Sequence, residues 1–393
     1  MSVFRQISSV TAMNLRSMPQ RIGSSSVIVV GIAVVVGVLL TVFALTLSLS
    51  DAVLATGSPD RAIVLRSGAT GEFSSALLTD AVATIKDAPG IARTEDGKPA
   101  ATADFVAAVN LFRKQDGARA GLSVRGVDAA IMSVRREIRI VDGRSFTPGL
   151  RELIVGRSAL GEFKDVAIGD AVALRDGRWT VVGVFESGRD ANESSLMTDS
   201  ATLLSAYQRT AVNSVTVRLE SEDAFDTFKT ALTTNPTLSV SVERETDFYR
   251  RQSEDANQIF GIIGIAVGIF MSLGAIFAAL NTMYSAVSVR TREIATLRAI
   301  GFGAGGVIVS VLVEALILAL IGAAVGAAAS WLLYNGNTVT LGDSTGSMVF
   351  DMQITPALLL VGVLLACSVG FIGGLFPAVR AARLPVATAL RAV

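Results

Sequence analysis

The sequence predicts a membrane protein in which four transmembrane helices carry a large extracytoplasmic α+β domain between helices 1 and 2. Hydrophobic residues make up 51% of the chain and charged residues only 17%, with a mean hydropathy of +0.55. A soluble domain carries about a quarter charged residues. Four apolar runs are also long enough to cross a hydrocarbon core, which takes about 20 residues of helix. These runs occupy residues 24–49, 258–287, 303–334 and 355–376.

The first run is expected to be an uncleaved anchor. It is longer than the roughly 7–15 residues of a signal-peptide core, and it lacks a clear A-x-A cleavage site. Ahead of it, residues 1–23 place apolar side chains such as Phe4, Ile7 and Val10 at nearly helical spacing. This spacing indicates an amphipathic helix on the inner membrane surface, with an ordinary basic flank as the alternative.

The distribution of arginine predicts the orientation in the membrane. The N-terminal segment, residues 288–302 and the tail 377–393 each carry three arginines, whereas the loop 335–354 has no Lys or Arg. Short segments rich in Lys and Arg stay in the cytoplasm. We therefore expect both termini and residues 288–302 to be cytoplasmic, and residues 50–257 and the loop 335–354 to lie outside.

Two β-α-β patterns frame the outside domain. In each, a strand, a helix and a strand follow in order, at residues 61–67, 74–90 and 102–112, and again at 213–220, 221–234 and 238–245. This arrangement suggests a split ferredoxin-like, porter-type subdomain. An insert at about 120–205 is richer in strands, and Asp142-Gly143 and Asp176-Gly177 are hairpin signals within it. We expect this insert to be a small β-rich subdomain.

Composition excludes several kinds of active site. The chain has no histidine and a single cysteine, Cys367. This excludes Ser-His-Asp and Cys-His catalysis, histidine-ligated zinc and an intramolecular disulfide. No G-x-x-x-x-G-K-[ST] phosphate loop occurs, so ATP and its magnesium would have to be bound by another chain. A net charge of zero gives no case for nucleic acid. We expect a non-catalytic chain without a cofactor or metal of its own.

Small residues and one acid stand out within the spans. Three G-x-x-x-G pairs let helix backbones approach closely in lipid: Gly264 and Gly268, Gly322 and Gly326, Gly370 and Gly374. Intrachain packing and a homodimer face both stay open as interpretations. Glu314 is the one acid well inside a span, and intramembrane acids are costly and usually face protein or water. No other span offers a buried base, so structural hydrogen bonding is favoured over a proton relay, and a Glu314→Gln protein is expected to work nearly normally.

Three segments carry a resemblance to a known family. "RTREIATLRAIGF" (290–302) follows the second span, and "FPAVRAARLPVATALRA" (376–392) ends the fourth, while "ELIVGRSAL" lies in the outside domain. With the order of parts, these motifs resemble the ABC transporter permeases of the MacB/FtsX type (type VII), which include MacB-like and LolC/E-like permeases. The resemblance covers most of the chain and is nearly silent on the substrate.

The resemblance implies that residues 288–302 form a coupling helix that docks on a cytoplasmic ATPase subunit. The residues suit that role: Arg290, Arg292, Glu293 and Arg298 offer charge pairs, and Ile294, Leu297 and Ile300 offer apolar anchors. As the alternative, the arginines only fix topology while Arg290 and Glu293 pair at i, i+3. The "GAGG" that follows, at 303–306, departs from the basic residues often found there in the family. The tail arginines Arg380 and Arg383 fit either a site near the ATPase or a plain stop signal.

For function, the resemblance implies a permease subunit in a bacterial inner membrane. Cytoplasmic ATP hydrolysis by a separate subunit would move the outside domain, with residues 250–256 extending the second span as a stalk. The result would be export or extraction of a peptide, lipoprotein, lipid or macrolide-like drug. The alternative is a mechanotransmitting scaffold that activates a hydrolase or sensor without moving cargo. Expected partners are the ATPase, a second permease copy (the same chain or a paralogue), the bilayer and a periplasmic adaptor protein.

Overall fold

The computed structural model describes residues 22–175, 177–300, 303–343 and 346–383. The amphipathic helix expected at residues 1–23 and the end of the tail therefore lie almost wholly outside the described residues. The chain forms two compact units. The span unit holds the described residues up to 47, residues 258–337 and residues from 352 onward, and the extramembrane unit holds residues 48–257 and 338–351.

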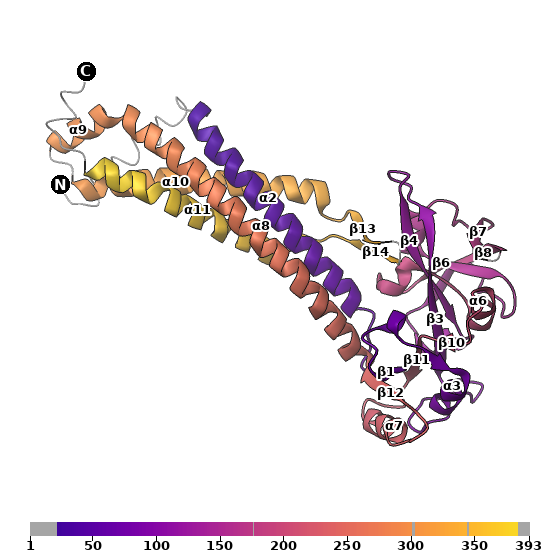
Figure 1. The fold of residues 1–393 in the computed structure, drawn as a ribbon. Helices are drawn as coiled ribbons and strands as arrows, with labels where there is room; N and C mark the ends of the chain where they lie inside the picture. Colours follow the sequence, from indigo (N-terminus) through magenta and orange to yellow (C-terminus); the bar gives the residue numbers. More distant parts are fainter. Residues whose placement is uncertain (1–21, 176, 301–302, 344–345, 384–393) are drawn as a thin grey trace. The chain divides into compact units, whose positions relative to one another are not determined.

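Among the residues that the structure describes, four helices are long and apolar enough to cross a membrane. They are α2 (Ile22–Leu54), α8 (Glu245–Val289), α10 (Ala304–Tyr334) and α11 (Pro356–Ala382), and Figure 1 shows them side by side within the span unit. Helix α8 begins well before the predicted span and includes residues 250–256 without interruption. Helix α11 begins with Pro356 in its first turn, and the Thr355 hydroxyl caps it by accepting from the Leu358 N–H.

Glycine sets how closely these helices approach one another. A Cβ at Gly326 would overlap the carbonyl oxygen of Ala33, and one at Gly322 would lie 2.9 Å from that of Val29. The other four glycines of the G-x-x-x-G pairs face side chains of the same chain in the same way: Gly264 meets Val42, Gly268 meets Leu39, Gly370 meets Ala319 and Gly374 meets Ala315. All six thus lie at contacts between helices of one chain, where only small residues permit close packing.

A four-stranded antiparallel sheet with two helices forms the first half of the extramembrane unit. Its strand order is β12-β1-β11-β3. The elements are β1 (Arg61–Arg66), α3 (Thr79–Lys86), β3 (Ala101–Phe112), β11 (Ser214–Arg218), α7 (Ala224–Thr233) and β12 (Val240–Arg244). The chain order β-α-β, insert, β-α-β is the split pattern expected from the sequence. Phe228, Ile85 and Val64, all buried, form the centre of its core.

The insert joins this sheet instead of forming a separate one, because β3 is long enough to pair twice. Its first residues pair with β11, and Phe105–Phe112 pair with β4 (Arg119–Val127). The sheet then continues in the order β4-β9-β6-β8-β5. The added strands are β5 (Arg139–Gly143), β6 (Glu152–Gly156), β7 (Ala171–Leu174), β8 (Gly177–Glu186) and β9 (Ser195–Asp199). Trp179 and Phe163, both fully buried, lie in the core of this part.

Short elements complete this unit. They are the strands β2 (Leu77–Leu78) and β10 (Ala211–Val212), the helices α4 (Ile131–Val134), α5 (Arg157–Glu162) and α6 (Ser200–Ala206), and the 3-10 turns η2 (Glu72–Ser74) and η3 (Ala191–Ser194). β2 and β10 pair with each other as a separate two-stranded sheet. The short helices contact the edges and faces of the large sheet, as α6 does with β4 and β3.

One of the two predicted hairpins is wrong. Asp142-Gly143 does not turn the chain between neighbouring strands, because β5 pairs with β8 and not with β6. Instead the register shifts between Ile140 and Asp142, so Val141 is the extra residue of a bulge and the dipeptide directly follows it at the end of β5. Gly143 has a φ of +70°, a left-handed conformation that favours glycine. β7 and β8 do form an antiparallel hairpin, whose last pair is Leu174 and Gly177, although Asp176 itself lies outside the described residues.

A bidentate ion pair holds the connection between β5 and β6, and it predicts a dependence on pH. Arg144 contacts both carboxylate oxygens of Glu152, one at 2.6 Å. This hydrogen-bonded pairing lowers the pKa of Glu152 to about 2, against the opposing effect of its burial. A folded-state pKa below the unfolded value of about 4.3 stabilises the fold above that value, and the stabilisation is lost as pH falls toward 2. Between pH 5 and pH 3, we expect the melting temperature of the Glu152→Gln protein to fall less than that of the parent.

The measurement can use a fluorophore that the unit already holds. Thermal unfolding of the full chain would be followed through Trp179, the neighbour of Thr180, which pairs with Glu152. A Trp331→Phe background removes the chain's other tryptophan. Glu162→Gln changes the charge equally at another carboxylate of the unit and serves as control. If the melting temperature of Glu152→Gln falls with pH as steeply as that of the parent, the pairing is refuted.

The loop expected at residues 335–354 is largely a β-hairpin. Strands β13 (Thr338–Asp343) and β14 (Gly346–Asp351) pair with each other and pack on the extramembrane unit. Val349 is buried in the core around Trp179, and its N–H and C=O both bond to the Ser194 hydroxyl, at 2.9 and 2.8 Å. Arg189 pairs with Asp351 at 2.6 Å. The segment between α10 and α11 is thus part of the extramembrane core.

Candidate functional site

The arginine-containing segment after α8 forms a short helix of its own. Arg290 leaves helical geometry, with φ −96° and ψ 6°, and caps α9 (Thr291–Ala299). Its carbonyl accepts the first helical hydrogen bond, from the Ile294 N–H at 2.9 Å. The break at Arg290 therefore separates α9 from α8 by a single residue.

A buried ion pair fixes the start of α9 to the span helix α10. The Arg290 Nη1 lies 3.0 Å from the Glu314 Oε2, and the two side chains are only 6% and 7% exposed. Glu314 therefore has a basic partner that the sequence did not reveal. The base comes from the segment between the spans and not from a span, which is why a search of the apolar runs does not find it. Removing one partner of such a pair strands a buried charge, which is costly.

The Arg290–Glu293 pairing considered within α9 is present as well, but it is longer than the Arg290–Glu314 pair. The Nε of Arg290 is 4.0 Å from Glu293, an exposed carboxylate, whereas Glu314 is hydrogen bonded. Arg290 is thus unavailable to a partner surface. Ile294 is also buried within the chain, at 7% exposed. Both residues were expected to face a partner, and both instead anchor α9 to its own chain.

The remaining predicted contact residues of α9 are accessible. Arg292 and Glu293 are exposed, Arg298 is partly exposed, and Ile300 just beyond the helix is 72% exposed. The side chain of Leu297 lies outside the described residues. Together with Ile300, α9 therefore presents two cations, one carboxylate and one aliphatic side chain. Arg290 and Ile294 hold this segment to the rest of its own chain.

A second polar centre lies at the start of α8 in the extramembrane unit. Glu245, fully buried, accepts from Arg61 through its Nε and from Arg135 Nη2 at 2.5 Å. It also accepts from the Ser58 N–H at 3.2 Å. Arg61 and Arg135 both donate to the carbonyl oxygen of Thr56 as well. Sequence reasoning ended a strand at residue 245 and missed this cluster, because the residues that donate to Glu245 lie 110 to 187 positions away from it.

A third buried cluster joins η2 to β3 and β4. Arg125 donates hydrogen bonds to both carboxylate oxygens of Glu72, at 2.8 and 2.7 Å, and to Asp104 at 3.0 Å. Burial alone would raise the pKa of Glu72, but the paired guanidinium of Arg125 lowers it to about 2. Burial raises the pKa of Asp104 despite the same arginine. One cation thus serves two acids, and its two shorter contacts are to Glu72.

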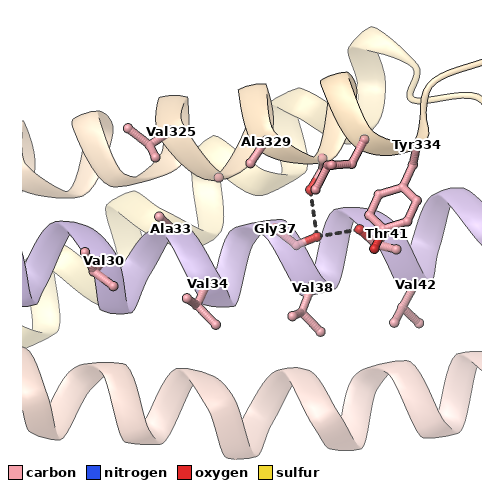
Figure 2. A pocket seen from close by; sticks show the side chains of 13 residues that line it. Val30, Ala33, Val34, Gly37, Val38, Thr41, Val42, Val325, Ala329 and Tyr334 are labelled. Atoms are coloured by element: carbon pink, nitrogen blue, oxygen red, sulfur yellow. Dashed lines mark hydrogen bonds between the residues drawn. The ribbon is translucent and has the colours of Figure 1, made fainter.

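An apolar groove runs between α2 and α10 in the span unit. It has a volume of about 440 Å³ and is lined by Val30, Val34 and Val38 on one side and Val325 and Ala329 on the other (Figure 2). The only polar side chains in its wall besides Tyr334 are Thr41 and Ser330, whose hydroxyls both donate to the Gly37 carbonyl, at 2.8 and 2.9 Å. Within the described part of the chain, no His, Cys, Asp and Glu side chains gather as a metal site requires.

Two family models match the chain in succession. The model for the MacB-like periplasmic core domain matches residues 25–235, more than half of the chain, and the model for the FtsX-like permease C-terminal region matches residues 265–386. The chain belongs to the MacB/FtsX family of ABC transporter permeases. Members are the non-catalytic, membrane-spanning components of their transporters. The second match contains α9 and the Arg290–Glu314 pair.

Two solved structures are similar to part of this MacB/FtsX permease. One is the crystal structure of the periplasmic region of MacB from Actinobacillus actinomycetemcomitans, 14% identical, with a TM-score of 0.37, covering 50% of this chain and 92% of that one. The other is the extracellular domain of the noncanonic ABC-type transporter YknZ from Gram-positive bacteria, 16% identical, with a TM-score of 0.36, covering 47% and 99%. No curated protein matches the chain with significant similarity.

Proposed function

We propose that this chain is the permease subunit of an ATP-driven complex in the bacterial inner membrane. A separate ATPase subunit binds ATP and magnesium and docks on α9, and its motion is transmitted to the extramembrane unit to export or extract a substrate. The observation that carries the proposal is the accessible charged face of α9, held to α10 by a buried ion pair, in an FtsX-like permease region.

The anchoring of α9 explains how a push on it would be transmitted. A helix with loose ends would absorb the displacement, whereas Arg290 and Ile294 tie α9 to its own chain. Helix α8 ends one residue before α9 and runs unbroken from Glu245, which is locked in the cluster with Arg61 and Arg135. In this proposal both termini and α9 face the cytoplasm, as the arginine distribution predicts.

The test is capture of the ATPase by the detergent-purified permease. We expect Arg292→Glu combined with Arg298→Glu to abolish capture of a candidate ABC ATPase from the same genome, because both arginines on the accessible face are reversed. ATP turnover in the captured fraction is the readout. A matched double reversal, Arg157→Glu with Arg250→Glu, changes two exposed arginines of the extramembrane unit and should capture normally. Equal capture by both doubles would place docking away from α9.

Other members of the complex follow from the same proposal. A second permease copy, either this chain or a paralogue, would complete the membrane part, and a periplasmic adaptor would extend it. The substrate class covers peptides, lipoproteins, lipids and macrolide-like drugs. A mechanotransmitting scaffold without cargo is the second candidate, favoured by the unbroken α8 helix. Cargo movement in reconstituted vesicles, compared with ATP turnover alone, separates the two.

A further inference from the structure

A polar pocket of about 370 Å³ lies where the end of α8 meets the end of α11. Asn281, Ser285 and Ser288 line it from α8, Thr291 from the first turn of α9, and Arg380 from the last turn of α11. None of the described residues that line it is acidic. The pocket is distinct from the apolar groove between α2 and α10 and from the accessible face of α9.

The spacing of the α8 residues turns a polar stripe toward this pocket. Positions 281, 285 and 288 follow one another at four and three residues, so they share one face of the helix. Asn281, Ser285 and Ser288 are all exposed to this space. Polar side chains at the end of a membrane helix are costly in hydrocarbon and are expected to face water or a polar ligand. The stripe therefore indicates a polar occupant.

The cation of the pocket is positioned by an aromatic ring. The guanidinium of Arg380 lies 5.4 Å from the centroid of the Tyr284 ring. A guanidinium beside an aromatic ring keeps its planar fork of N–H donors, which suits bidentate binding of a phosphate. Tyr and Arg at the end of a span are also the residues found at the level of lipid headgroups.

The same two helix faces continue into apolar surface one turn deeper in the membrane. Phe277 lies four residues before Asn281 on α8 and is 66% exposed, and Phe376 lies four residues before Arg380 on α11 and is 57% exposed. Each phenylalanine therefore shares a face with a polar member of the pocket. A ligand with a phosphate at one end and an acyl chain at the other matches this sequence of surfaces.

We propose that this pocket binds an anionic phospholipid, with its phosphate on Arg380 and the α8 stripe and its acyl chain along Phe277 and Phe376. The charge of the pocket complements the headgroup, and basic pockets between span helices on the cytoplasmic side are suited to such lipids. Because Thr291 is both a wall of the pocket and the first residue of α9, the lipid braces the segment that carries Arg290. This inference rests on the transmembrane spans and not on docking of an ATPase.

The test is native mass spectrometry of the full chain in detergent, titrated with dioleoyl phosphatidylglycerol or with dioleoyl phosphatidylcholine. We expect one phosphatidylglycerol to bind in preference to phosphatidylcholine. Arg380→Gln should weaken it by about fivefold, the effect of one basic residue near an anionic surface. Arg383→Gln removes the same charge from an exposed neighbour outside the pocket and should bind as the parent does. Equal losses in Arg380→Gln and Arg383→Gln would overturn the pocket in favour of general surface charge.

A second pocket variant and a competition with soluble phosphates complete the test. They guard against misfolding of a single variant and distinguish a lipid phosphate from a free one. Ser285→Leu fills the pocket without changing charge and should also weaken phosphatidylglycerol. Inorganic phosphate and glycerol phosphate lack the acyl chain and should fail to displace the lipid at equal concentration. Displacement by either would make the ligand a free phosphate and overturn the lipid. If Arg380→Gln keeps phosphatidylglycerol but loses the captured ATPase, the pocket receives an acidic protein side chain instead, which also refutes the proposal.

Discussion

Glu314→Ala should destabilise the span unit and uncouple the complex. The substitution leaves the guanidinium of Arg290 buried and unpaired, and breaking a buried pair by removing one partner costs about 3–5 kcal/mol. The freed arginine would also release the first turn of α9 from α10. We therefore expect a lower melting temperature together with a loss of ATPase stimulation. Cys367, the chain's only cysteine, reports unfolding through a thiol-reactive dye without any introduced label.

A double replacement separates the pair from a general need for either residue. Arg290→Leu with Glu314→Leu removes both charges, and replacing a buried pair by apolar residues is often neutral or stabilising. The double should melt near the parent temperature, while each single melts well below it. Glu293→Ala provides the matched control, since Glu293 is exposed and 4.0 Å from Arg290. A Glu293→Ala protein that melts as low as Glu314→Ala would mean that the partner has been misassigned.

Glu314→Gln is an intermediate case. The sequence alone leads to a nearly normal Glu314→Gln protein, because no basic partner is visible among the apolar runs. With Arg290 at 3.0 Å, the amide keeps a hydrogen-bond acceptor but no longer neutralises the guanidinium. We expect a melting temperature between those of the parent and Glu314→Ala, and partial loss of coupled ATP turnover.

Much of this fold can be predicted from the sequence, because the patterns that indicate it lie within short segments. The four spans are continuous apolar runs, and both β-α-β patterns show in periodicity and breaker residues. Where a local signal has two readings, prediction fails. Asp142-Gly143 fits a hairpin turn and a strand end next to a bulge equally well, and only the pairing of β5 with β8 decides between them. The left-handed φ of Gly143 is common to both.

The parts of the site that could not be predicted depend on long-range pairing. Arg290 looks like one of three similar arginines, and its hydrogen-bonded partner Glu314 lies 24 positions away on another helix. The sequence predicts a loop where β13 and β14 form a hairpin. It does not show the hairpin because the contact that holds it, between Val349 and the Ser194 hydroxyl, joins residues far apart in the chain. The accessibility of Arg292 and Glu293 can be predicted without long-range contacts, because charged side chains at the end of a span are usually exposed.

Glu245→Ala should be the most damaging single change in the extramembrane unit. It removes the close carboxylate partner of Arg135, whose side chain is 1% exposed, and leaves that cation only Glu137 at 4.0 Å. Arg61, 5% exposed, keeps an ion pair with Glu137 at 2.8 Å. The loss in free energy of unfolding should reach at least the 3–5 kcal/mol typical of one broken buried pair. Urea unfolding of the full chain, followed through Trp179 in the Trp331→Phe background, measures it as a shift in midpoint at constant slope.

Glu243→Ala is the matched control, because it removes a carboxylate two residues earlier in the same segment. Glu243 pairs with Arg251, and both side chains are about a third exposed, so its loss should cost no more than about 1 kcal/mol. The comparison also bears on mechanism, since Glu245 is the first residue of α8 and α8 ends one residue before α9. If the cluster only stabilises the domain, Glu245→Gln at a permissive temperature should restore ATP-driven activity along with folding. If it anchors α8 for transmission, a folded Glu245→Gln protein should still hydrolyse ATP yet fail to move cargo.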